Sequence, residues 1–231
     1  MNLLCGTSGF SYKEWKGSFY PQKHPDKEML SYYASQLTAV EINNTFYRMP
    51  KENVLQAWAE KVPDTFKFSI KASRKITHFK RLKECEDECG YLFKMVRTLE
   101  KKLGCILFQL PPNLKIDIER LEKFLKIIPD DIKAAFEFRH PSWLIDDIYQ
   151  MLNSKNCSLV ITETDEAPKA KFTETADWTY LRLRRTQYSK EELSERMEKI
   201  KKSNWEDVLV FFKHEDEGTG PRLAKQFMEL S

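Results

Sequence analysis

Glycine is scarce in this chain of 231 residues, which contains only 7. The shortage argues against several glycine-built phosphate loops, because average proteins contain about 7% glycine. An excess of one charge is also missing, since 38 basic and 35 acidic residues leave a net charge of +3. That balance excludes a histone-like or polybasic protein, although it leaves room for a local basic surface.

Long apolar segments and paired cysteines are absent as well. No run approaches the roughly 18 apolar residues of a membrane helix, and the first residues, MNLLCGTSGF, lack the basic and apolar regions of a signal peptide. The five cysteines form an odd number and include no C-x-x-C pair. We therefore expect reduced thiols, a cytoplasmic location and no membrane partner.

Aromatic residues and short β-rich apolar runs are abundant. Most intervals between the runs carry apolar residues at helical spacing. The interval before Trp178 is short and contains Pro168, so we expect an irregular connection there. The eight runs begin near Asn2, Ala39, Phe66, Gly104, Lys133, Ser158, Trp178 and Asp207.

Helix-start signals support the alternation of strands and helices. Asp117 is a suitable N-cap, Ser189 and Glu192 form an S-x-x-E capping box, and Pro221 fits the first turn of a last helix. Eight strand–helix units predict an α/β chain with a parallel sheet closed into a (β/α)8 TIM-like barrel, as one domain over residues 1–231. An open doubly wound sheet is the alternative, because periodicity does not distinguish the two.

Several motifs occur in the order typical of one family. They are Gly6-Thr7-Ser8-Gly9-Phe10, Val40 to Arg48 (VEINNTFYR), Ile76-Thr77-His78, Leu107 to Pro111 (LFQLP) and Glu137-Phe138-Arg139-His140 with Trp143. On these residues the chain resembles the YecE-like family, also called domain of unknown function 72. The resemblance covers essentially the whole chain and implies a TIM-barrel-like fold, but no particular biochemical activity.

Two late stretches depart from that family pattern. Where the family usually has Arg-x-His-Gly, this chain reads Arg182-Leu183-Arg184-Arg185. Where an asparagine-bearing turn is common, it reads Lys213 to Gly218 (KHEDEG). Family roles for that histidine or asparagine therefore do not carry over, and chemistry must be inferred from the residues present.

Alternation along the strands predicts which side chains enter the barrel. If the apolar positions face the helices, two carboxylates and five cations point inward, most of them late in their strands. The sixth strand is ambiguous, because Glu163 and Asp165 share parity with apolar Leu159 and Ile161. The inward set is Glu41, Asn43, Lys71, Gln109, Glu137, Arg139, Arg182, Arg184 and Lys213.

Two interpretations of this set remain open. It is either a structural salt-bridge network or an arginine-lined, anion-binding cleft at the C-terminal face of the strands, where barrel enzymes place their sites. The late-strand positions favour the second, with Glu137 and Glu41 as acid–base groups assisted by His78 and His140. The expected substrate-binding residues are Asn43, Tyr47, Lys71, Gln109, Arg139, Trp143, Arg182, Arg184 and Lys213.

The main functional hypothesis is an enzyme of hydrolase or lyase type acting on an anionic substrate, such as a phosphorylated sugar, a nucleotide or a nucleic acid strand. One alternative is a non-catalytic module that binds a metabolite or single-stranded nucleic acid, because aromatic residues are frequent in the predicted rim loops. Another is a metal-assisted phosphoesterase or nuclease. The cofactor and the oligomeric state stay open. Candidate ligands for a divalent metal are His78, His140, Glu137, Glu163 and Asp165.

Overall fold

The computed structural model describes residues 1–213 and 216–231; His214 and Glu215, in the second stretch that departs from the family pattern, lie outside the described residues. Every strand pairing in the sheet is parallel. The strand order is β6-β5-β4-β3-β2-β1-β9-β8-β7. The strands are β1 (Asn2–Ser8), β2 (Ala39–Ile42), β3 (Lys67–Lys71), β4 (Leu103–Gln109), β5 (Ala134–Glu137), β6 (Ser158–Leu159), β7 (Ile161–Glu163), β8 (Trp178–Leu183) and β9 (Asp207–Phe212).

One short segment closes the ring. Strand β6 pairs with β5, strand β7 pairs with β8, and only Val160 separates β6 from β7. The predicted sixth strand is therefore split in two, and its halves join the two edges of the sheet. The expected TIM-like barrel is confirmed, rather than an open doubly wound sheet.

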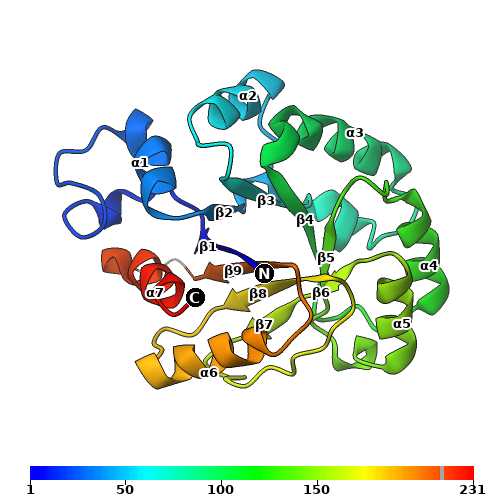
Figure 1. The fold of residues 1–231 in the computed structure, drawn as a ribbon. Helices are drawn as coiled ribbons and strands as arrows, with labels where there is room; N and C mark the ends of the chain where they lie inside the picture. Colours follow the sequence, from blue (N-terminus) through cyan, green and yellow to red (C-terminus); the bar gives the residue numbers. More distant parts are fainter. Residues whose placement is uncertain (214–215) are drawn as a thin grey trace.

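Helices surround the strands on the outside, as Figure 1 shows. Between β3 and β4, an α-helix that ends at Val96 is followed directly by a 3-10 turn at Arg97–Lys102. Residues 164–177, all of them described, form bends and coil instead of a helix, as Pro168 suggested. The helices are α1 (Met29–Gln36), α2 (Glu52–Glu60), α3 (Glu86–Val96), α4 (Ile118–Ile127), α5 (Asp146–Ser154), α6 (Lys190–Lys201) and α7 (Thr219–Met228).

Capping residues fix where several helices begin. The Asp117 side chain accepts a hydrogen bond from the Arg120 N–H at the start of α4, at 3.0 Å. Ser189 and Glu192 form the predicted capping box of α6. Pro221 lies buried in the first turn of α7, where a missing N–H is tolerated.

Alternating side chains divide the buried residues into two clusters. The larger one packs between strands and helices and includes Phe68, Phe108 and Phe136. The smaller one contains residues of the opposite strand parity, such as Leu107 and Phe211, and fills the inside of the barrel. The predicted inward and outward faces of these strands are therefore confirmed by the packing.

Close approach of β1 to β2 requires glycine at position 6. A Cβ atom there would lie 1.7 Å from the Ala39 carbonyl oxygen and 2.8 Å from the Tyr33 hydroxyl. That hydroxyl accepts a hydrogen bond from the Thr7 N–H and donates one to the Ala39 carbonyl. Gly6 thus lets α1 and β2 close against β1, which sets the position of Ser8 and Glu41 at the strand ends.

All five cysteines are free and buried. Cys85 and Cys89 lie with their sulfur atoms 3.9 Å apart at the start of α3. Within the part of the chain that the structure describes, no helix is long and apolar enough to cross a membrane. The cytoplasmic location stays a prediction.

Candidate functional site

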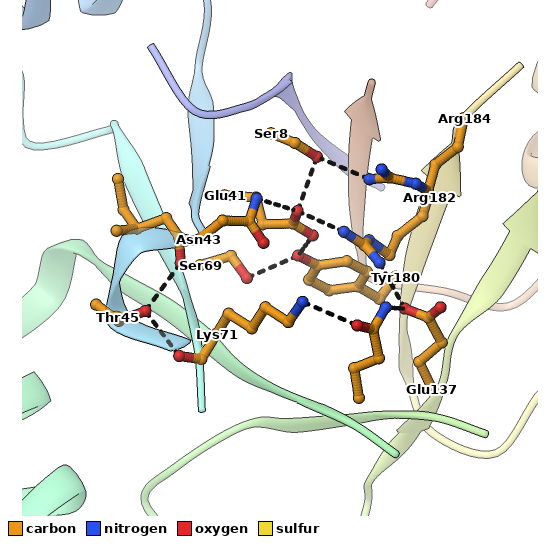
Figure 2. Close-up of polar contacts among 12 residues, drawn as sticks. Ser8, Glu41, Asn43, Thr45, Ser69, Lys71, Glu137, Tyr180, Arg182 and Arg184 are labelled. Atoms are coloured by element: carbon orange, nitrogen blue, oxygen red, sulfur yellow. Dashed lines mark hydrogen bonds and ion pairs between the residues drawn. The ribbon is translucent and has the colours of Figure 1, made fainter. Parts of the chain in front are cut away.

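Two buried carboxylates share one arginine at the C-terminal ends of the strands. Arg182 of β8 donates from Nη2 to Glu41 Oε1 at 2.8 Å and from Nη1 to Glu137 Oε2 at 2.7 Å. Glu41 belongs to β2 and Glu137 to β5, and all three residues are at most 4% exposed. Figure 2 shows this group, which we call the buried triad, spanning the barrel from three separate strands.

Glu41 is surrounded by donors. Ser8 Oγ and Asn43 Nδ2 donate to its Oε1 at 2.7 and 2.9 Å, and the Tyr180 hydroxyl donates to its Oε2 at 2.7 Å. Burial raises the pKa of this carboxyl, but Arg182 and the hydrogen bonds outweigh burial and lower the pKa to about 2. Glu41 is therefore a fixed negative charge at neutral pH.

Glu137 is also held in its ionised form. Gln109 Nε2 donates to its Oε2 at 2.8 Å, and Arg139 Nε lies 3.5 Å from its Oε1. Burial raises its pKa, yet Arg182 and Arg139 hold the pKa below the usual value. Neither carboxylate has the pKa near neutrality that efficient proton exchange requires.

Three further cations lie around the triad with fewer partners. Lys71 Nζ donates to Gln109 Oε1 at 2.8 Å, and Arg184 Nη1 lies 3.5 Å from Ser8 Oγ. The Arg139 side chain is 44% exposed. Arg182, Lys71, Arg139 and Arg184 are thus four cations beside two carboxylates, which leaves an excess of two positive charges among these six side chains. We call Lys71, Arg139 and Arg184 the anion site.

The pKa values of two of these cations reflect that excess. Burial and then the charge of Arg182 lower the pKa of Lys71 to about 8. Burial and Arg182 also hold the pKa of Arg184 below its usual value. A bound anion would counter both effects, because an opposite charge favours the protonated form of each cation.

The turn after β2 positions Lys71 and connects it to two predicted rim residues. The Thr45 hydroxyl donates to the Lys71 carbonyl at 2.7 Å (Figure 2), and Lys71 Nζ lies 4.4 Å from the centre of the Phe46 ring. The His78 ring packs against Phe46 at 4.9 Å, and the Tyr47 ring packs against Phe46 at 5.1 Å. The structure therefore brings His78 and Tyr47 beside the anion site.

His78 is held in its neutral form. Its Nδ1 lies 2.9 Å from the Thr77 hydroxyl. Burial, and then Lys71 and Arg139, keep its pKa below the usual 6.5. Its imidazole therefore contributes hydrogen-bonding capacity rather than charge at neutral pH.

Trp143 and His140, both predicted at the site, serve the packing of their own loop. Trp143 is fully buried, stacks on Phe138 at 4.7 Å and donates from Nε1 to the Leu114 carbonyl. It has no exposed surface in this structure, which gives its predicted contact with substrate no support, and that contact stays a prediction. His140 Nδ1 accepts from the Ser142 N–H and caps the short turn Pro141–Trp143.

Glu163 and Asp165, the ambiguous residues of the sixth strand, do not join the triad. Glu163 is buried on the outer side, where Arg196 of α6 donates from Nε to both carboxylate oxygens at 3.2 Å. Asp165 accepts from the Thr186 N–H at 3.0 Å in an exposed loop. Among residues 1–213 and 216–231, no group of three or more His, Cys, Asp or Glu side chains could hold a metal ion.

Two residues of the site, Tyr180 and Ser8, were not predicted from the sequence, and the predicted Lys213 lies at the edge of the site. Tyr180 and Ser8 both contact Glu41, and alternation could have found Tyr180, which lies two positions before Arg182 on the same strand. Lys213 follows β9 as predicted and is half-buried. Its N–H donates to the Leu183 carbonyl, so it lies at the same end of the barrel as the triad.

A family model described as "Protein of unknown function DUF72" matches residues 4–231. The chain belongs to the DUF72 family. Its curated relatives include UPF0759 protein YunF of Bacillus subtilis, 30% identical over 141 residues, which are 58% of this chain and 50% of YunF. UPF0759 protein YecE of Escherichia coli is 30% identical over 115 residues, which are 49% of this chain and 42% of YecE.

The chain therefore spans about half the length of the curated relatives it matches. Solved structures of DUF72 proteins are matched over nearly their full length. A DUF72 protein of Thermotoga maritima is 27% identical with a TM-score of 0.86, covering 100% of this chain and 99% of that one. A DUF72 protein of Enterococcus faecalis is 20% identical with a TM-score of 0.79, covering 99% and 94%, and supports the fold alone.

Proposed function

We propose that the DUF72 barrel is an enzyme that binds the phosphate group of an anionic substrate at the C-terminal ends of its strands. The observation that carries this proposal is the excess of two cations around the buried triad. Uncompensated positive charge beside a low-dielectric interior attracts an anion strongly. Arginine is suited to a phosphate because its planar donors match the oxygens in pairs.

The residues divide into two groups with different roles. The anion site (Lys71, Arg139 and Arg184) holds the anion, and the buried triad beside it keeps these three side chains in position. Glu41 and Glu137 stay ionised, so they orient the cations instead of exchanging protons. Lys71, with a pKa of about 8, is the group suited to proton transfer near neutral pH. This assignment moves the acid–base role from the two carboxylates to the lysine.

A calorimetric titration with inorganic phosphate and pyrophosphate tests the binding step. Arg184→Ala should weaken binding roughly 10- to 150-fold, because a hydrogen bond to a charged group contributes about 1.5–3 kcal/mol. Arg222→Ala is the matched control, since Arg222 is an exposed arginine on α7 and its loss changes the net charge equally. Equal affinity of wild type and Arg184→Ala, with both proteins folded, would contradict the proposal.

Turnover distinguishes an enzyme from a non-catalytic binding module. Phosphate esters that bind in the calorimeter should be incubated with the protein and followed by phosphorus NMR. An enzyme of the proposed kind changes the phosphorus spectrum, and Lys71→Ala abolishes the change. Binding that depends on Arg184 without any change in the spectrum would support the binding module instead.

A further inference from the structure

Exposed aromatic rings gather on one side of the anion site. Among the described residues, the exposed large apolar side chains include three aromatic ones: Tyr47 at 70%, Phe79 at 66% and Tyr91 at 54%. Tyr47 follows β2, Phe79 follows β3, and Tyr91 lies in α3. Rings this exposed add little to the stability of the fold, since burial is what makes an aromatic side chain stabilising.

Arg74 organises two of these rings. Its guanidinium carbon lies 5.4 Å from the centre of the Tyr47 ring and 5.3 Å from the centre of the Phe79 ring. The Arg74 side chain is itself exposed, so the three groups form an open surface of two rings and a cation. We call Tyr47, Arg74 and Phe79 the aromatic platform.

A groove of about 750 Å³ adjoins the platform. Tyr47 lines it together with Arg48, Lys51, Lys75 and Tyr91. It also contains Asp87 and Glu88, and Glu88 is paired with Lys80 at 2.7 Å. The groove thus has three cations, Arg48, Lys51 and Lys75. Of its two carboxylates, Glu88 is paired with Lys80, and Asp87 forms no ion pair in the described part of the chain.

Four basic residues of this region form no ion pair in the described part of the chain. Within 4.0 Å, the ion pairs formed by residues 1–213 and 216–231 involve none of Arg48, Lys51, Arg74 and Lys75. Unpaired cations interleaved with exposed rings are the features by which proteins hold single-stranded nucleic acid. In such proteins the cations bind the phosphates along the strand, and the rings stack on the bases.

The platform is continuous with the anion site. The Phe46 ring contacts both Lys71 Nζ, at 4.4 Å, and the Tyr47 ring, at 5.1 Å. Only the Phe46 side chain therefore lies between a phosphate held by Lys71 and the exposed ring of Tyr47.

We propose that the substrate is a strand of single-stranded nucleic acid, with a phosphate in the anion site, neighbouring bases on Tyr47 and Phe79, and the backbone running along the groove. This proposal rests on the proposed function, because it extends the same phosphate site.

Fluorescence anisotropy with a short labelled oligodeoxythymidine tests it directly. An abasic oligonucleotide with the same number of phosphates and a duplex of the same length are the reference probes. The single strand binds more tightly than both. Tyr47→Ala and Phe79→Ala each weaken its binding roughly 5- to 150-fold, the range for loss of one base–aromatic stack. Tyr47→Phe keeps the affinity, because stacking needs the ring and not the hydroxyl.

Two controls separate stacking and charge from general damage. Ile118→Ala removes an apolar side chain of 43% exposure on α4 and leaves binding unchanged. Arg74→Ala lowers the slope of log affinity against log salt by about 0.7, the value for one phosphate contact on a single strand. Arg222→Ala leaves the slope as it is in the wild type.

The outcomes distinguish this proposal from the one on which it rests. If the abasic and the base-bearing strand bind with equal affinity while phosphate binding still depends on Arg184, the proposal of a single-stranded substrate is overturned and the proposed phosphate site stands. Equal affinity for thymidine monophosphate and the strand overturns it too, in favour of a free nucleotide. Strand binding that depends on Tyr47 but not on Arg184 or Lys71 overturns the phosphate site of the proposed function and leaves the platform.

Discussion

Replacing Arg182 by methionine tests the buried triad most severely. Arg182 is 2% exposed and pairs with both Glu41 and Glu137, which are 0% and 4% exposed. The variant keeps most of the side-chain volume but leaves two carboxylates buried without their counter-ion. Breaking a buried ion pair in this way costs about 3–5 kcal/mol, so we expect a loss of that size in the free energy of unfolding at pH 7.

The pH dependence of the free energy of unfolding shows whether the stranded charge of Glu41 causes this loss. In the wild type the pKa of Glu41 is about 2, against an ordinary value of 4.5. This difference contributes about 3 kcal/mol of stability, which is complete above 4.5 and is lost as the pH falls toward 2. In Arg182→Met, burial without the arginine raises the pKa of Glu41 above 4.5. The contribution then changes sign, and stability falls as the pH rises through 4.5.

Urea unfolding followed by tryptophan fluorescence measures both effects. The difference in unfolding free energy between wild type and Arg182→Met should be largest near neutral pH and should shrink toward about pH 4. Adding Glu41→Gln to Arg182→Met removes one of the stranded charges and should recover part of the loss at neutral pH.

A purely steric effect would give a different result. If the loss in Arg182→Met were the same at every pH, or if Glu41→Gln deepened it, the electrostatic account of the triad would be refuted. The single variant Glu41→Gln is the reference for the added substitution, since it leaves Arg182 paired with Glu137 alone.

Three further predictions concern the anion site and the frame of the barrel. Phosphate affinity measured by calorimetry should fall as the pH rises through about 8, where Lys71 loses its charge. The Lys71→Arg variant should show the same affinity below and above that pH. Asp117→Ala should lower the free energy of unfolding by about 1 kcal/mol in urea titrations, because it removes the cap on the Arg120 N–H. Gly6→Ala should yield no folded protein by circular dichroism, because its Cβ would lie 1.7 Å from the Ala39 carbonyl oxygen; a native spectrum would contradict the packing of β1 on β2.

Strand alternation was enough to predict the inner charged residues. Val40 and Ile42 pack outward, so Glu41 between them must point inward, and the same reasoning places Arg182 between Leu181 and Leu183. Apolar parity is a strong signal because an error of one residue would expose a whole strand face. The capping residues of α4 and α6 were predictable for the same local reason.

Features that depend on distant partners were not predictable. Trp143 was expected to bind substrate, and its position in the sequence did not indicate that its ring would be buried on Phe138. Glu163 lies at an outward position that normally holds an apolar residue. Arg196, which comes from α6 and follows 33 positions later in the chain, makes its burial there acceptable. Sequence spacing contains no information on such pairs.

The buried triad also has a structural role, because the strands that close the barrel are short. Strand β6 forms two register pairs with β5, and β7 forms three with β8, whereas β8 and β9 share six. The segment 158–163 is therefore where amide hydrogen exchange should report the first local opening of the ring. Glu137 and Arg182 lie on β5 and β8, the two strands that flank this segment. Their ion pair joins the ring across its weakest ladder, so the charges that shape the site also keep the barrel closed.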